Sequence, residues 1–431
     1  MNEQSAIITA FESLCDESKP AALATVVSVS GSAYRRPGAR MLIAEDGRTW
    51  GGISGGCLER DVVRRSRGVL ASGRAVVCRY ETSDDEDLAS GVATGCRGTV
   101  DLFIEPLSRE SPGPIPWMIQ ASRHRRTVGL ATIVRTSATN DGDHAGARVS
   151  LDKAGAVDGQ VVDPDLRGFC LEALSDASAG KSKLIHFRTD GMTADVFLEC
   201  LLPPQELVIF GAGPDAVPVV AIAKLVGWRV SVVGVRPATG LAQRFAHADA
   251  LHVASPEDPV AGVEVTRQAA VVLMTHNYPR DLAILAGLPV VPRYLGILGP
   301  RIRTEQLFAD LNIHARSCAK GLVGSALRTD LPPIEKMVRS ADPTQITLCL
   351  SAVNKSDWQS AFAPVGLDLG AETPEEIALS IVAEIQAVLR STPAGFLRDR
   401  NGPIHATHEA EKARGDGQEL QRVWREVACP M

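Results

Sequence analysis

The chain has 431 residues, of which 45% are hydrophobic and 22% charged, and its formal net charge is −6. A chain of this length forms two or three domains with buried cores, and its negative charge, without a Lys/Arg cluster interleaved with aromatic residues, excludes broad nucleic-acid binding. Nine cysteines without framework spacing, no signal-peptide pattern and no apolar stretch of membrane-spanning length predict a cytoplasmic protein rather than a secreted or membrane one.

The first distinctive segment is a glycine-rich loop, GGISGGCLE, at residues 51–59. Glycines at this density allow positive φ angles and a close approach of the backbone to a ligand. Apolar residues at helical spacing follow from Leu58 to Arg65, so we expect Cys57 at a helix N-terminus, where the helix dipole favours a thiolate. The loop therefore predicts a nucleophilic or sulfur-carrying cysteine. The residues expected to surround its ligand are Ser54, Gly55 and Gly56.

A second cysteine, Cys96, lies in the similar segment TGCRGT at 94–99, just before a strand-like run at 100–104. Arg97 places a fixed cation beside it. Because a buried apolar thiol needs neither flanking glycines nor an arginine, we interpret Cys57 and Cys96 as functional. The remaining cysteines are interpreted as small buried hydrophobes: Cys15, Cys78, Cys170, Cys200, Cys318, Cys349 and Cys429.

An internal duplication supports this interpretation. Residues 21–27, 37–42 and 98–106 reappear in the same order as 128–134, 145–150 and 193–200. The second copy has Pro164 near the place of Cys57, and it has no counterpart of the segment around Cys96. If the glycines and cysteines were needed for folding, both copies would carry them. Their restriction to the first copy favours a functional role.

A different pattern begins after Pro203-Pro204, which we predict to close an internally duplicated N-terminal α+β domain, residues 1–203. A strand at 206–210, a G-x-G-x-x-A turn and helix at 211–227, and a second strand at 229–233 match the dinucleotide-binding fingerprint. The alternation continues, so the fold class is α/β. We predict a Rossmann-like domain with a doubly wound parallel sheet at 204–395, with an insertion at about 313–360, and a polar C-terminal extension at 396–431.

The predicted second strand lacks the acid that holds the ribose hydroxyls of NAD, because Gly234 stands at that place. Arg236 follows and could meet a phosphate, as in an NADP site or a site for another phosphorylated ligand. Ligands of open α/β sheets bind at the carboxyl ends of the strands. The residues expected to border that crevice are Gly211, Gly213, His276 and Gly299. The alternative is a glycine turn that serves only the passage from strand to helix.

The last strong local pattern is a helix that begins at Thr373. Thr373 as N-cap, Pro374 at N1 and Glu376 at N3 form a capping box with a proline start. An apolar stripe continues to about Thr392, which predicts a helix packed on the sheet.

Seven segments in order resemble the xanthine dehydrogenase accessory (XdhC/CoxI) family, and they span most of residues 20–395. They are 31–39 (GSAYRRPGA), 55–59 (GGCLE), 95–98 (GCRG), 211–213 (GAG), 274–278 (MTHNY), 295–301 (LGILGPR) and 366–377. The resemblance implies a chaperone that binds the molybdenum cofactor, as molybdopterin or its dinucleotide form, and hands it to an apo molybdenum hydroxylase. It also implies a cysteine desulfurase as partner for sulfuration of the cofactor.

Under this resemblance Cys57 and Cys96 become candidates for cofactor binding, sulfur handling or metal ligation. The side chains that could contact its anionic groups are Arg36, Ser54, Arg97 and Arg301. Three positions depart from the family pattern: Pro214 and Phe362 stand in place of histidines, and Gly234 in place of an aspartate. A chaperone must shield its cofactor, which predicts a homodimer with both cysteines facing a cleft shared with the Rossmann domain.

Two other classes of protein remain open. An NADP-dependent oxidoreductase would use Cys57 as nucleophile or redox partner and would turn over without other proteins. A thiol- or metal-dependent hydrolase would use Cys57, Cys96 and His276, but the sequence contains no C-x-x-C or H-E-x-x-H spacing to supply a metal site.

Overall fold

A computed structural model of the chain describes residues 3–31, 33–82, 98–138, 144–176, 182–235, 240–319 and 361–399. The chain divides into two compact units. The two-sheet unit comprises Ala10–Pro114, Gly129–Cys200 and Gly395–Met431. The Rossmann unit comprises Met1–Thr9, Ile115–Val128 and Leu201–Ala394. One division falls inside helix α1 (Glu3–Asp16), and helix α3 (Ile115–Ser122) begins at another.

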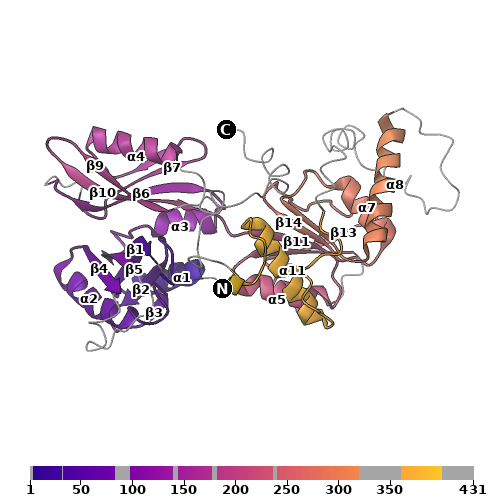
Figure 1. The fold of residues 1–431 in the computed structure, drawn as a ribbon, viewed down its shortest axis with the longest axis horizontal. Helices are drawn as coiled ribbons and strands as arrows, with labels where there is room; N and C mark the ends of the chain where they lie inside the picture. Colours follow the sequence, from indigo (N-terminus) through magenta and orange to yellow (C-terminus); the bar gives the residue numbers. More distant parts are fainter. Residues whose placement is uncertain are drawn as a thin grey trace. The chain divides into compact units, whose positions relative to one another are not determined.

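The two-sheet unit contains two five-stranded sheets (Figure 1). The first has the order β3-β2-β1-β5-β4 and the second β8-β7-β6-β10-β9, which is the same order displaced by five strands. The predicted duplication thus takes the form of two equivalent sheets. The strands are β1 (Ala21–Gly31), β2 (Arg40–Ala44), β3 (Thr49–Gly51), β4 (Val76–Thr82), β5 (Gly98–Leu107), β6 (Val128–Thr136), β7 (Arg148–Asp152), β8 (Val157–Gly159), β9 (Lys183–Arg188) and β10 (Thr193–Leu201).

Each sheet buries one face under its own helix and the other face against the other sheet. Alternate strand residues point to opposite faces, so one strand contributes to both cores. Helix α2 (Glu59–Ser72) packs on the first sheet through Val62 and Val69, and α4 (Pro164–Asp176) packs on the second through Leu166 and Cys170. The core between the sheets contains matching residues of the two copies: Val27 with Val134, and Phe103 with Phe197.

Two buried ion pairs join the sheets, and they are reciprocal. Arg40 of the first copy pairs with Glu199 of the second, and Arg148 of the second pairs with Glu105 of the first at 2.5 Å. All four side chains are at most 8% exposed. Each guanidinium also donates to the carbonyl oxygen two residues before it, Gly38 at 3.2 Å and Gly146 at 2.6 Å. An exchange of this kind has the geometry of a two-fold symmetric interface.

The Rossmann unit is built on a parallel sheet with the order β13-β12-β11-β14-β15. Its strands are β11 (Glu206–Phe210), β12 (Arg229–Val235), β13 (Ala250–Ala254), β14 (Ala270–Leu273) and β15 (Tyr294–Ile297). Helices α5 (Ala216–Leu225) and α11 (Pro374–Leu389) cover one face, and α7 (Tyr278–Gly287) and α8 (Arg301–Ala319) cover the other. This arrangement confirms the predicted Rossmann-like doubly wound sheet.

The predicted start of the last strong helix is confirmed, while its predicted end differs from the observed one. The capping box at Thr373 and Glu376 is present. Helix α11 ends at Leu389 rather than near Thr392. Beyond it, the N–H groups of Ser391 and Thr392 donate to the carbonyl oxygens of Val388 and Ala387, so the helical hydrogen-bond pattern does not continue. Helix α8 continues to Ala319. Most of the predicted insertion and of the C-terminal extension lies outside the described residues. No described helix combines the length and apolarity needed to cross a membrane.

We predict that the reciprocal pairs are needed for stability. Replacing Glu105 by leucine leaves Arg148 buried without a counter-charge, which should lower the free energy of unfolding by about 3–5 kcal/mol. Adding Arg148→Met removes the stranded charge and should recover most of that loss. Denaturant unfolding of the full-length protein measures both variants, with Glu110→Gln on the surface as the control. A Glu105→Leu variant within about 1 kcal/mol of wild type would contradict the account.

Candidate functional site

Cys57 lies on the loop between β3 and α2, immediately before Leu58, the N-cap residue of the helix. This is the placement that the sequence predicts. Of the five cysteines whose side chains are described, only Cys57 is exposed. Cys78 and Cys170 are buried, and Cys15 and Cys200 are partly buried. The thiol of Cys57 is therefore the one among them that a large ligand or a partner protein can reach directly.

The loop is braced from inside by Glu59, the first residue of α2. Its carboxylate accepts hydrogen bonds from the N–H groups of Ile53 and Ser54, at 3.4 and 2.9 Å, and from the Ser54 hydroxyl. Partial burial alone would raise the pKa of the Glu59 carboxyl, but the hydrogen bonds from Ser54 and Ile53 outweigh it and lower that pKa. The Ser54 hydroxyl oxygen in turn accepts from Gly56 and Leu58 at 3.1 and 3.2 Å.

Two glycines of the loop have distinct structural roles: one allows an unusual backbone conformation, and the other leaves room for a neighbouring ring. Gly56 has φ +110°, a conformation that L side chains rarely adopt. A β-carbon at Gly55 would lie 3.7 Å from the ring of Tyr34, so that ring packs on the loop backbone. Within the described chain, the N–H groups of Gly55 and Cys57 have no hydrogen-bond partner. These two donors, on either side of Gly56, are available to an anionic ligand.

The second copy shows that a helix at this place in the fold forms without such a loop, since α4 is the counterpart of α2. There β8 ends at Gly159 and α4 already begins at Pro164, after a shorter connection. The carboxylate of Asp163 accepts from the N–H of Leu166 at 2.8 Å, which is ordinary N-capping. The longer glycine-cysteine loop is thus an addition specific to the first copy.

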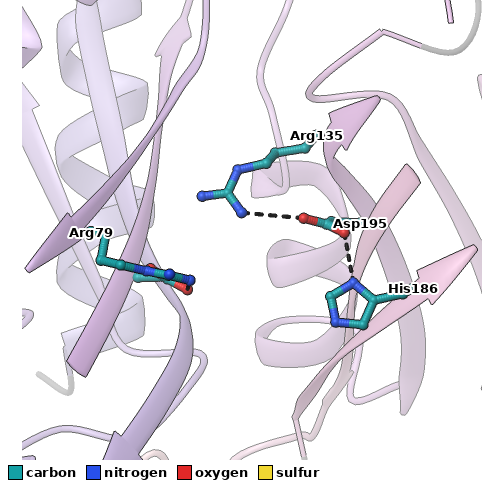
Figure 2. A network of polar contacts seen from close by, with 5 residues as sticks. Arg79, Arg135, His186 and Asp195 are labelled. Carbon is teal, nitrogen blue, oxygen red and sulfur yellow. Dashed lines mark hydrogen bonds and ion pairs between the residues drawn. The ribbon is translucent and has the colours of Figure 1, made fainter. Parts of the chain in front are cut away.

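A further polar cluster lies at the equivalent edge of both copies. Figure 2 shows Asp195 of β10 between Arg135 and His186, with contacts of 3.2 and 2.7 Å. Arg79 of the first copy pairs with Asp101 at 2.8 Å. The side chains of Arg79, Arg135 and His186 are 55%, 45% and 73% exposed, so solvent screens these pairs and each contributes little to stability. We interpret them as a solvated edge of the duplicated scaffold.

In the Rossmann unit a cavity of about 240 Å³ opens at the glycine turn. Gly211, Gly213 and His276 line it, as predicted. Gly211 has φ +131°, and a β-carbon there would lie 2.3 Å from the carbonyl oxygen of Met274, so only glycine allows β11 and β14 to approach. Gly299 does not line the cavity, which corrects the prediction. It follows the edge strand β15, whereas the cavity lies over β11, β12 and β14.

Hydrogen bonds fix the side chains around the turn. His276 has φ +53°, and its Nε2 lies 2.8 Å from the carboxylate of Asp215, the N-cap residue of α5. Thr275 donates to the buried carboxylate of Asp281 at 2.5 Å, and Arg303 pairs with the same carboxylate at 2.6 Å. The segment that carries His276 is therefore anchored on both sides.

Other predicted residues lie outside this cavity or outside the described chain. Arg301 begins α8, is 80% exposed and pairs with Glu305 at 2.9 Å, so its charge already has a partner. Cys96, Arg97 and Arg236 lie outside the described residues, and their roles remain predictions.

Sequence reasoning missed two cationic residues of the cavity, Arg244 and Arg280. Arg244 ends the short helix α6 (Leu241–Arg244), and Arg280 lies in the first turn of α7. The available signal was their position: each follows the carboxyl end of a strand next to β11. Among the residues with described side chains, no three His, Cys, Asp or Glu are grouped to hold a metal ion.

The fold and sites define a two-unit protein with an exposed cysteine on a duplicated α+β scaffold and a ligand-sized cavity in a Rossmann unit. Comparison with known families identifies both parts. The XdhC and CoxI family matches residues 14–81, and the XdhC Rossmann domain matches 207–322 and 339–385. These matches cover more than half of the chain. The chain belongs to the XdhC and CoxI family.

Relatives extend the similarity over most of the sequence. A Bacillus subtilis protein, named as a probable xanthine dehydrogenase subunit, is 29% identical over 88% of this chain and 96% of its own. The molybdenum cofactor insertion chaperone PaoD of Escherichia coli is 25% identical over 65% of this chain and 67% of its own. A crystal structure described as a xanthine dehydrogenase from Bacillus halodurans is 26% identical, covers 90% of this chain and 96% of its own, and has a TM-score of 0.63.

We predict that Glu59→Ala loosens the cysteine loop. The N–H groups of Ile53 and Ser54 lose their acceptor, so amide hydrogen exchange of residues 52–58 should accelerate and stability should fall by about 1–3 kcal/mol. Because the folded-state pKa of Glu59 is depressed, its contribution is complete above the ordinary pKa of about 4.3. It is lost as the pH falls through the lower folded value. Glu45→Ala, on an exposed turn, is the control. Unchanged exchange in the Glu59 variant would contradict the bracing role.

Proposed function

We propose that this protein binds the molybdenum cofactor and inserts it into an apo molybdenum hydroxylase of the xanthine dehydrogenase or CO dehydrogenase type. One observation carries the proposal: Cys57 stands exposed on a braced glycine loop that the first copy has and the second copy lacks. The relationship to PaoD, a molybdenum cofactor insertion chaperone, supplies the chemical context.

The chemistry of the loop fits such a ligand. A cysteine thiolate is a soft ligand that suits a metal already bound by sulfur. The N–H groups of Gly55 and Cys57, at the start of α2, suit the pterin phosphate. When bound, the cofactor supplies the metal centre that the hydroxylase uses. The chain's own part is to hold it at Cys57 until transfer, with Glu59 fixing the loop. Cys96 and Arg97 are proposed to complete this site.

Three finer statements belong to the same proposal. A cysteine desulfurase is a second partner, which delivers sulfur for sulfuration of the cofactor. The protein is a homodimer whose cysteine loops are shielded from solvent. It works in the cytoplasm, where free thiols such as Cys57 stay reduced.

An NADP-dependent oxidoreductase is the second candidate, and the cavity at the Gly211 turn is the observation that favours it. It would use a bound nicotinamide and turn over without another protein. Cofactor insertion, in contrast, requires the apo-hydroxylase. A thiol- or metal-dependent hydrolase on Cys57, Cys96 and His276 ranks third. Incubation of the purified protein with NADPH and with hydrolase substrates, without other proteins, separates these alternatives from the chaperone.

We predict that Cys57→Ala and Cys96→Ala each reduce molybdenum cofactor retained by the purified protein at least about 10-fold, because each removes a sulfur ligand. The melting temperature should stay near wild type, since Cys57 is exposed. Cys15→Ala, a partly buried cysteine of α1, is the matched control. Molybdenum and pterin content after purification from the natural host measure the effect. Wild-type cofactor content in both variants would exclude the proposed site.

A further inference from the structure

Two arginines enter the Rossmann cavity from opposite sides of the glycine turn. Arg244 ends α6, which follows β12, and Arg280 lies in the first turn of α7, which follows β14. Strands β12 and β14 are the two neighbours of β11, which leads into the turn at Gly211. The two side chains therefore place positive charge on both sides of the position where Rossmann folds bind phosphate.

Neither arginine has a carboxylate partner among the described residues. Three other cations of the same unit have carboxylate partners: Lys224 with Asp249, Arg303 with Asp281, and Arg125 with Glu206 and Glu264. Arg244 instead donates to the carbonyl oxygen of Ala212 at 3.0 Å, which holds it at the glycine turn.

The carboxylate beside the turn does not cancel this charge. Asp215 is hydrogen-bonded to His276 rather than to either arginine. At formal charge, Arg244 and Arg280 contribute +2 and Asp215 contributes −1, so these three groups sum to +1. The cavity is thus complementary to an anion.

The other residues that line the cavity limit which anion it can bind. At Gly234 a β-carbon would lie 3.3 Å from Ala212 Cβ and from Leu241 Cδ2, so the strand end has little room for the acid that binds a ribose diol. Phe210, Leu241 and Met274 give the cavity an apolar side. Its volume of about 240 Å³ is below the roughly 300–1,000 Å³ of pockets for drug-sized ligands. This size favours one nucleoside phosphate over an entire dinucleotide.

We infer that this cavity binds a nucleoside phosphate, with Arg244 and Arg280 holding the phosphate and the apolar side receiving the nucleoside. The ligand can be a free nucleotide, the nucleotide half of a pterin dinucleotide, or the phosphorylated ribose of NADP, since all share this chemistry. The inference stands on the Rossmann unit alone and does not depend on cofactor insertion.

Calorimetry of the full-length protein tests it with CMP, GMP and AMP, the matching nucleosides, NADP and NAD as probes. At least one phosphorylated probe should bind at least about 10-fold more tightly than its unphosphorylated match, because the arginines contact only the phosphate. NADP should exceed NAD by a similar factor, since NAD lacks a phosphate monoester and meets no acid at Gly234. Preference for a 5′-monophosphate points to a free nucleotide or a pterin dinucleotide, and preference for NADP alone points to the 2′-phosphate.

Arg244→Gln and Arg280→Gln should each weaken binding of the preferred probe about 10- to 100-fold. Arg229→Gln, at the exposed start of β12 and outside the cavity lining, should leave affinity unchanged. Melting temperatures near wild type establish that the variants fold. Equal affinity for a nucleoside and its phosphate, wild-type affinity in both cavity variants, or no binding by any phosphorylated probe would overturn the inference.

Discussion

Two buried Arg–Glu ion pairs, each joining one copy of the duplicated unit to the other, determine how the two sheets of the N-terminal half pack together. A buried charge costs several kcal/mol unless it is paired, so Arg40 requires Glu199 as strictly as Arg148 requires Glu105. With the four-residue apolar core beside them, these pairs fix the face that each sheet turns to the other. The opposite faces and the connections beyond β3 and β8 are under no such constraint.

That freedom explains how the two copies diverged. The second copy passes from Gly159 to α4 through a short connection capped by Asp163, whereas the first copy inserts the glycine-cysteine loop braced by Glu59. In both copies the connection begins beside the buried arginine: the N–H of Gly52 donates to the carbonyl oxygen of Arg40 at 2.9 Å, and that of Gln160 to Arg148 at 2.7 Å. The longer loop of the first copy is thus compatible with the same ion-pair arrangement. A duplicated scaffold can in this way keep one copy for packing and use the other to present a reactive side chain.

Local patterns made much of the fold predictable. The repeated segments indicated two equivalent sheets, the G-x-G-x-x-A turn indicated the Rossmann unit, and the capping box at Thr373 indicated the start of α11. Pairings between distant residues were not predictable, because nothing near Arg40 in the sequence indicates Glu199, 159 positions away. For the same reason the sequence shows Glu59 only as a helix residue, and its role as acceptor for the loop emerges from the folded geometry.

The two candidate sites differ in chemistry as well as in position along the chain. The cysteine loop offers a thiol and two N–H groups, while the Rossmann cavity offers two arginines and an apolar side. Sequence reasoning identified Gly211, Gly213 and His276, which form the walls of that cavity, but the cations that determine its ligand come from helix residues with no motif around them. Glycine patterns in the sequence predict where the backbone makes a tight turn. Which charged side chains are left to bind a ligand depends on which of them have no carboxylate partner in the folded protein.

The most direct test of the account is differential alkylation of the cysteines with and without bound molybdenum cofactor, read by mass spectrometry. If the glycine-cysteine loop holds the cofactor, Cys57 should be modified much more slowly in the loaded protein, while the partly buried Cys15 and Cys200 react at the same rate in both forms. Equal modification of Cys57 with and without cofactor would contradict the central claim.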